Sequence, residues 1–138
     1  MKTFVEFRSD NFPPYDGEEE DINPGLWGKR LAEYFVENLT SDGIETEEII
    51  AEDWGYYIPV VISGSRLAIC CGHQYGDDNE FLCFTDPGKP IVRKLLKKVD
   101  TTQELSQLLE AIKSILDKDN DIHDINWYTP EEFKNPTG

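Results

Sequence analysis

The sequence predicts a single α+β domain over residues 1–138, with a mostly antiparallel sheet of about five strands and two principal helices in the order βαββββα. Three observations predict this class. An alternating strand pattern opens the chain, two later segments carry apolar residues at helical spacing, and short apolar runs follow one another with brief polar breaks. Brief breaks favour antiparallel neighbours, because a parallel pair needs a crossover of a dozen residues or more.

The first element is a half-buried strand over residues 2–8, because its side chains alternate between two faces. One face carries Thr3, Val5 and Phe7, and the other carries Phe4 and Glu6. Residues 10–24 then form an exposed acidic loop, since a run of like charges cannot pack into an apolar core. Its acids fill five of six positions: Asp16, Glu18, Glu19, Glu20 and Asp21.

Two amphipathic helices frame the remaining strands. The first spans about residues 25–41, where apolar residues recur at three- and four-residue spacing. The second runs to about residue 117 and begins at a capping box, in which Thr101 and Glu104 each accept the other's backbone N–H. Both helices are expected to pack on one face of the sheet.

Four apolar runs make the rest of the sheet, and three of them are apolar on both faces. That pattern predicts a sheet covered on both sides, by the helices on one and by the tail or a partner on the other. Pro59 lacks an N–H and weakens pairing on one side of its strand. The predicted strands are residues 44–50, 56–62, 67–71 and 81–84.

Two segments remain after the strands. Residues 89–98 are basic and fit either a strand or a short helix. The tail, residues 118–138, starts as a polar turn and then carries Ile125, Trp127 and Phe133, which we expect to dock on the core and to help cover the second sheet face. A homodimer interface on that face is the alternative.

Charge excludes several functions. The chain carries 28 acidic and 13 basic residues, net −15, which disfavours binding to nucleic acid or to a membrane surface. Residues 1–86 hold 19 acids and 5 bases, so almost all of the excess lies there. The sequence shows no signal-peptide pattern and no membrane span, and its three cysteines fit a reducing compartment, so we expect a cytoplasmic location.

Catalytic and metal chemistry find little support. Cys71 and His73 fall on one side of a predicted hairpin, which leaves open a small cytosolic enzyme or ligand-binding protein. A zinc site would draw on these two residues with Cys70 opposite Cys83, yet paired zinc knuckles are absent. The acidic run lacks the alternating spacing of a calcium loop. We therefore expect buried free thiols, with Cys70 and Cys71 on opposite sheet faces, and no metal or other cofactor.

Aromatic residues beside acids predict a binding surface. Glu52 and Asp53 precede Trp54 and Tyr56, a composition that supplies aromatic anchors within an acidic rim. The partner that such a surface predicts is a basic protein, bound without catalysis. The candidate binding residues are Asp16, Glu18, Glu19, Glu20, Asp21, Glu52, Asp53, Trp54 and Tyr56.

The chain resembles small acidic bacterial proteins that share a Glu-Asp-Trp-Gly-aromatic motif. The residues that carry the resemblance are Trp27-Gly28, Glu52-Asp53-Trp54-Gly55-Tyr56 and Ile125-Asn126-Trp127. It implies no activity and no site. In size and charge the chain is also similar to immunity proteins that neutralise toxins, which implies occlusion of a basic site on a nuclease-like toxin.

Overall fold

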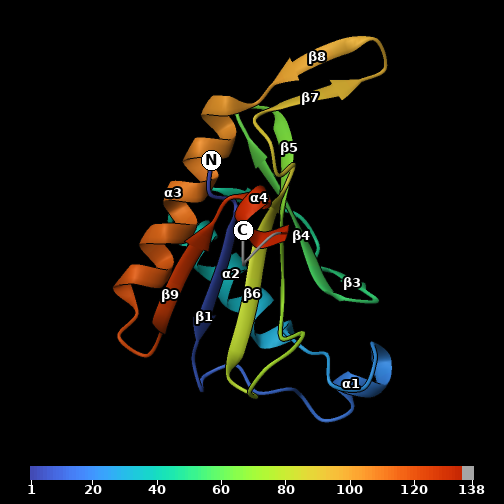
Figure 1. Ribbon diagram of the computed structural model, residues 1–138, viewed down its shortest axis with the longest axis vertical. Coiled ribbons are helices and arrows are strands. Elements are labelled where there is room, and N and C mark those ends of the chain that lie inside the picture. The colour runs from blue at the N-terminus through green and yellow to red at the C-terminus, as the bar shows by residue number, and fades with distance from the viewer. Residues whose placement is uncertain (135–138) are drawn as a thin grey trace.

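The computed structural model describes residues 1–134 and has the predicted α+β class. An antiparallel sheet runs in the order β2-β4-β5-β6-β1-β9, and β3 pairs with β4 beside β2. The hairpin β7–β8 forms a separate sheet that projects beyond one end of the body (Figure 1). The strands are β1 (Phe4–Arg8), β2 (Glu45–Thr46), β3 (Ile50–Glu52), β4 (Gly55–Ile62), β5 (Ser65–Gly72), β6 (Glu80–Asp86), β7 (Ile91–Lys94), β8 (Lys97–Asp100) and β9 (His123–Tyr128).

Both predicted helices exist and pack on the same face of the sheet. They are α2 (Lys29–Ser41) and α3 (Thr102–Lys118), and two short helices, α1 (Glu18–Asp21) and α4 (Pro130–Lys134), accompany them. Within residues 1–134, no helix has the length and apolar character that crossing a bilayer requires. The helix-side core joins residues of both long helices and of strands β1, β4, β5 and β6, among them Leu31, Phe35, Leu105, Leu108, Ile112, Val5, Phe7, Ile58, Ile69 and Phe81.

The predicted capping box of the second long helix is wrong. Thr101 is buried, and its hydroxyl donates to the Pro90 carbonyl at 2.9 Å instead of capping the helix. Asp100 takes over the role, because its carboxylate accepts the Thr102 backbone N–H at 2.9 Å. Asp100 therefore ends the hairpin and also accepts the first N–H of α3, so the base of the hairpin is tied to the body.

Pro59 explains why the predicted strand over residues 44–50 is two short strands. β2 pairs with the far half of β4, and the last bond on that side is the Glu47 N–H to the Pro59 carbonyl at 2.9 Å. Proline offers no N–H in return, so the ladder breaks there and resumes as β3 opposite residues 55–57. The edge of the sheet is split at the position where a donor is missing.

The tail is part of the sheet rather than a cover laid over it. β9 pairs antiparallel with β1, which places Ile125 and Trp127 against the helix-side core. Of the three expected anchors, Phe133 alone reaches the other face, where its ring stacks on Phe4 at 4.5 Å. The end of the predicted tail, residues 135–138, lies outside the described residues.

Three glycines form a junction between α2 and the sheet. A Cβ at Gly28 would lie 2.7 Å from the Gly72 Cα, and one at Gly55 would lie 2.7 Å from the Cys71 carbonyl oxygen. These backbones touch because none of the three has a side chain. The His73 N–H closes the junction by donating to the Trp27 carbonyl at 2.7 Å. The start of α2 is thereby locked against the end of β5.

Candidate functional site

The face of the sheet opposite the long helices, here called the open face, carries a line of aromatic rings. Trp54 lies 5.9 Å from Phe84 between ring centroids, Phe84 lies 5.1 Å from Phe4, and Phe4 stacks on Phe133 at 4.5 Å. All four side chains are half-buried. We call this line the aromatic stripe. Its four residues come from the β3–β4 turn, the adjacent strands β6 and β1, and the short helix α4, which are distant in the sequence.

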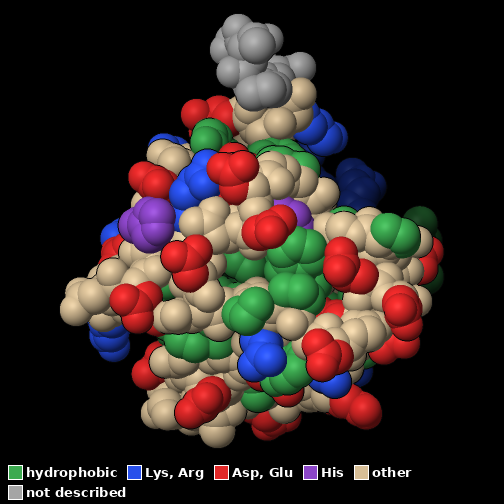
Figure 2. All heavy atoms as spheres, turned by 90° about the horizontal axis from the view of Figure 1, so that it is seen from below, with side chains coloured by type: hydrophobic (Ala, Val, Ile, Leu, Met, Phe, Trp, Pro, Cys, Tyr) green, Lys and Arg blue, Asp and Glu red, His purple; other side chains and the backbone are tan. Residues whose placement is uncertain are grey.

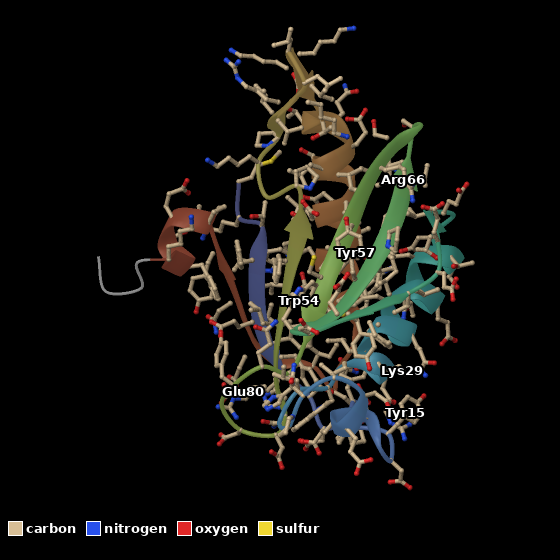
Figure 3. All side chains as sticks on the ribbon, turned by 90° about the vertical axis from the view of Figure 1, so that its right-hand side faces the viewer. Tyr15, Lys29, Trp54, Tyr57, Arg66 and Glu80 are labelled. Carbon is tan, nitrogen blue, oxygen red and sulfur yellow. The ribbon has the colours of Figure 1, made fainter. Side chains whose placement is uncertain are left out.

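Tyr57 lies on the same face as Trp54 (Figure 3). Its hydroxyl donates to the Asp86 carboxylate at 3.2 Å. Burial, together with the Asp86 charge, raises the pKa of Tyr57 to about 12. Tyr57 is therefore neutral at physiological pH and keeps a carboxylate at the edge of the aromatic stripe.

A pocket of about 180 Å³ lies on the open face beside the stripe, and we call it the Glu6 pocket. Three carboxylates and one guanidinium line it, so its charge is negative. The side chains that define it are Glu6, Arg8, Tyr75, Glu80, Asp124 and Asn126.

Arg8 offsets only part of the charge of the Glu6 pocket, because it pairs with Glu80 and Asp124 and leaves the Glu6 carboxylate without a cation. The guanidinium binds Glu80 at 2.6 Å and Asp77 at 3.0 Å, and it also donates to the Asn79 side chain at 3.0 Å. Asp124 lies 3.8 Å from its Nε. These bonds hold Arg8 to one wall of the pocket.

Glu6 interacts with hydroxyl groups rather than with a cation. The Tyr75 hydroxyl donates to its carboxylate. Burial first, and then the bond to Glu6, raise the pKa of Tyr75 above its ordinary value. Burial and the Glu6 charge also raise the pKa of Tyr128, whose ring lies 6.4 Å from Phe133. Tyr128 thus connects the Glu6 pocket to the aromatic stripe.

The predicted acidic loop is partly helical, and most of its acids are on the surface. Glu20 and Asp21 are exposed on α1, Asp16 is exposed just before it, and Glu19 is half-buried. Figure 2 shows this lower end of the molecule, where acidic side chains surround an apolar centre. The Asn23 amide donates to the Asp53 carbonyl at 2.8 Å, so the acidic segment adjoins the β3–β4 turn.

Glu18 and Tyr56 have structural positions, which corrects the expectation that they face a partner. Glu18 is 4% exposed, and its carboxylate accepts the N–H groups of Gly28 at 2.7 Å, Lys29 at 2.9 Å and Tyr15 at 2.9 Å. The first N–H groups of α2 have no partner within the helix, and a carboxylate is the best acceptor at a positive helix end. Tyr56 is also buried, and its desolvation and its bond to Glu18 raise its pKa.

The three cysteines are free and buried, and the predicted register between them is wrong by one residue. Cys71, not Cys70, lies opposite Cys83, because the turn at Asp77–Glu80 moves the centre of the loop. Cys71 belongs to the helix-side core, and Cys70 does not. Burial raises the pKa of Cys70 to about 12 and that of Cys83 well above its ordinary value, so both are protonated thiols.

The burial of Cys71 argues against the alternative of an enzyme that uses its thiol as a nucleophile. Cys71 is 0% exposed, so a substrate has no access to its thiol. His73 is 5% exposed, stacks on Trp27 at 4.0 Å and bonds the Glu80 carbonyl through Nδ1 at 2.7 Å. Neither residue lines the Glu6 pocket. Across residues 1–134, no group of three or more potential ligands is arranged to hold a metal ion.

Sequence reasoning named Trp54 of the aromatic stripe as a binding residue and Phe133 as an anchor on this face, and it missed the Glu6 pocket. A signal for the rest was present, because alternation had placed Phe4 and Glu6 together on the face away from the core. Comparison of the chain with protein-family models, with curated proteins and with solved structures finds no match. The case for a function therefore rests on the geometry of the open face.

Proposed function

We propose that this chain is a non-enzymatic binding protein whose open face takes a basic segment of a protein partner. The observation that carries the proposal is the junction of the Glu6 pocket with the aromatic stripe. A pocket with excess carboxylate suits one lysine or arginine head group, and aromatic rings beside it attract a second cation or an apolar side chain. Glu52 and Asp53, both exposed, add acidic charge next to Trp54.

Occlusion is the mechanism that this surface supports. A net charge of −15 speeds the approach of a basic partner, and desolvated aromatic contacts slow its departure. A cytoplasmic, immunity-like protein that covers the nucleic-acid site of a toxin would act in this way. In that case the protein and a nucleic acid compete for the same basic surface.

Binding of short lysine- and arginine-containing peptides, mapped by amide chemical shifts, tests the proposal. We expect the shifts to concentrate at Glu6, Trp54 and Phe84. Glu6→Gln should weaken binding about tenfold, in line with the loss of one charge-assisted hydrogen bond. Glu20→Gln removes the same charge from an exposed site on α1 and should leave binding within about twofold.

Two results would contradict the proposal. One is an equal loss of binding in the Glu6 and Glu20 variants, which would indicate attraction by overall charge without a site. The other is a set of shifts confined to a different face. Melting temperatures of both variants show whether a loss of binding reflects a loss of structure.

A further inference from the structure

The hairpin β7–β8 ends in two leucines that are almost completely exposed. Leu95 and Leu96 form its two-residue turn and are 100% and 99% exposed. The hairpin projects at the end of the molecule far from α1 (Figure 1). Burial of a leucine side chain stabilises a folded protein, and two fully exposed leucines at a projecting tip contribute no such stabilisation within the monomer.

The backbone of the turn gives a second, independent observation. Leu95 has a φ of 58°, in the left-handed region where glycine or asparagine is the ordinary choice. A leucine there is less stable than in the right-handed region, because its Cβ crowds the neighbouring carbonyl oxygen. The turn thus places an apolar side chain at the tip in spite of the strain, which indicates that this side chain has a contact outside its own chain.

The charge of the hairpin is opposite to that of the rest of the molecule. Residues 89–98 hold five basic residues and no acid, whereas the rest of the chain has 28 acids against eight bases, net −20. Four of the five lie in the strands beside the tip, namely Arg93, Lys94, Lys97 and Lys98. The hairpin is therefore a basic segment with apolar side chains at its tip, the kind of segment that the open face suits.

We propose that the hairpin of one copy of this chain docks on the open face of a second copy. Leu95 and Leu96 lie against the aromatic stripe in this arrangement, and the flanking lysines face the carboxylates of the Glu6 pocket and of Asp86. The inference rests on the proposed function, because it assigns a second copy as a basic partner of the same face. A membrane surface is a less suitable partner, because the rest of the chain has a net charge of −20 and anionic lipid would repel it when the hairpin approached the surface.

Sedimentation velocity over a range of protein concentrations tests the contact. The wild type should self-associate, and higher salt should weaken the association. Leu95→Ser with Leu96→Ser, and separately Lys94→Glu with Lys97→Glu, should each weaken it at least tenfold. These positions are exposed, so folding is retained. Lys2→Glu with Lys118→Glu makes the same charge change at exposed sites away from the hairpin and should have no such effect.

Mixing two defective variants separates a hairpin-to-face contact from any other. A face variant, Glu6→Gln with Trp54→Ala, has an intact hairpin, and the leucine variant has an intact face. Each alone should be monomeric, whereas the mixture should form a complex with one hairpin seated on one face. A mixture of the two hairpin variants should form none.

The alternatives give distinct results. A wild type that is monomeric at every concentration overturns the inference, and so does association that the hairpin variants leave unchanged. Monomers that bind phosphatidylserine vesicles through the hairpin overturn it in favour of a lipid surface. Binding of basic peptides to a monomeric wild type leaves the proposed function standing without the inference. Association through the hairpin and the open face, without peptide binding, supports the inference and rejects foreign partners.

Discussion

The acidic helix α1 and the basic hairpin are both short and highly charged, yet their relations to the body are opposite. In α1, the first residue, Glu18, is 4% exposed and holds three backbone N–H groups. At the hairpin tip, Leu95 and Leu96 are almost completely exposed. The charged residue is buried and structural, whereas the apolar residues are exposed. This reverses the usual pattern, in which charged side chains lie on the surface and apolar ones in the core. The comparison teaches that tertiary contacts, and not residue class, decide which side chains are available to a partner.

The largest expected effect comes from Glu18→Ala. It leaves the N–H groups at the start of α2 without their acceptor, and we expect the free energy of unfolding to fall by about 3 kcal/mol. Glu20→Ala removes an exposed acid from the same helix and should change it by less than about 0.5 kcal/mol. Urea unfolding of both variants measures the difference. Equal effects would show that Glu18 belongs with the surface acids.

A smaller effect of opposite sign is expected at the hairpin tip. Leu95→Gly relieves the left-handed strain and should raise the free energy of unfolding by about 0.5–1 kcal/mol. Leu96→Gly is the matched control, because Leu96 is equally exposed but has no positive φ, and it should give no gain. Urea unfolding at a protein concentration that keeps the chain monomeric measures both. A loss of stability in Leu95→Gly would reveal a contact of the leucine within its own chain.

The smallest effect is expected at Asp100, where the hairpin meets α3. Bonds from the Thr102 hydroxyl and backbone N–H lower the pKa of this carboxyl. A lowered pKa in the folded state adds stability above the ordinary carboxyl value of about 3.9, and that stability is lost as the pH falls through the lowered value. Asp100→Ala should therefore lower the melting temperature slightly at pH 7.

The pH dependence provides the control for Asp100. The difference in melting temperature from the wild type should begin to shrink as the pH falls below about 4 and should close once the pH has passed the lowered pKa of Asp100, because the wild-type carboxyl becomes protonated over that range. Asp78→Ala, at an exposed acid, should show little difference at either pH. A difference for Asp100→Ala that persists in acid would mean that its charge is not the cause.

The sequence predicted the helix-side core better than the rest of the fold. Leucine and isoleucine at helical spacing place Leu105, Leu108 and Ile112 on one face whatever the tertiary arrangement is. The hairpin was ambiguous because a Leu-Leu turn lacks glycine and asparagine, the usual turn signals. The strand β9 was missed because it follows a run of aspartates and pairs with β1, a partner more than a hundred residues away in sequence.

The candidate site was predicted only in part, because some of its residues meet through pairings between segments that are distant in sequence. Trp54 stands out locally because acids precede it, whereas Tyr75 and Phe133 reach Glu6 and Phe4 through pairings that no local pattern encodes. The role of Glu18 had an indirect signal. α2 begins after Gly28 and carries no acid in its first turn, so its N–H groups need an acceptor from elsewhere in the chain.

The glycine junction also bears on the order in which the molecule folds. Gly28, Gly55 and Gly72 meet only when the β4–β5 hairpin exists and α2 has reached it, so the junction closes over contacts that are distant in sequence. Such contacts are slow to form, since chain entropy is lost before they contribute. The Gly28 and Lys29 amides that bind Glu18 lie beside this junction. We therefore expect the Gly28 and Lys29 amides to become protected from hydrogen exchange late in refolding, after the β4–β5 hairpin has formed.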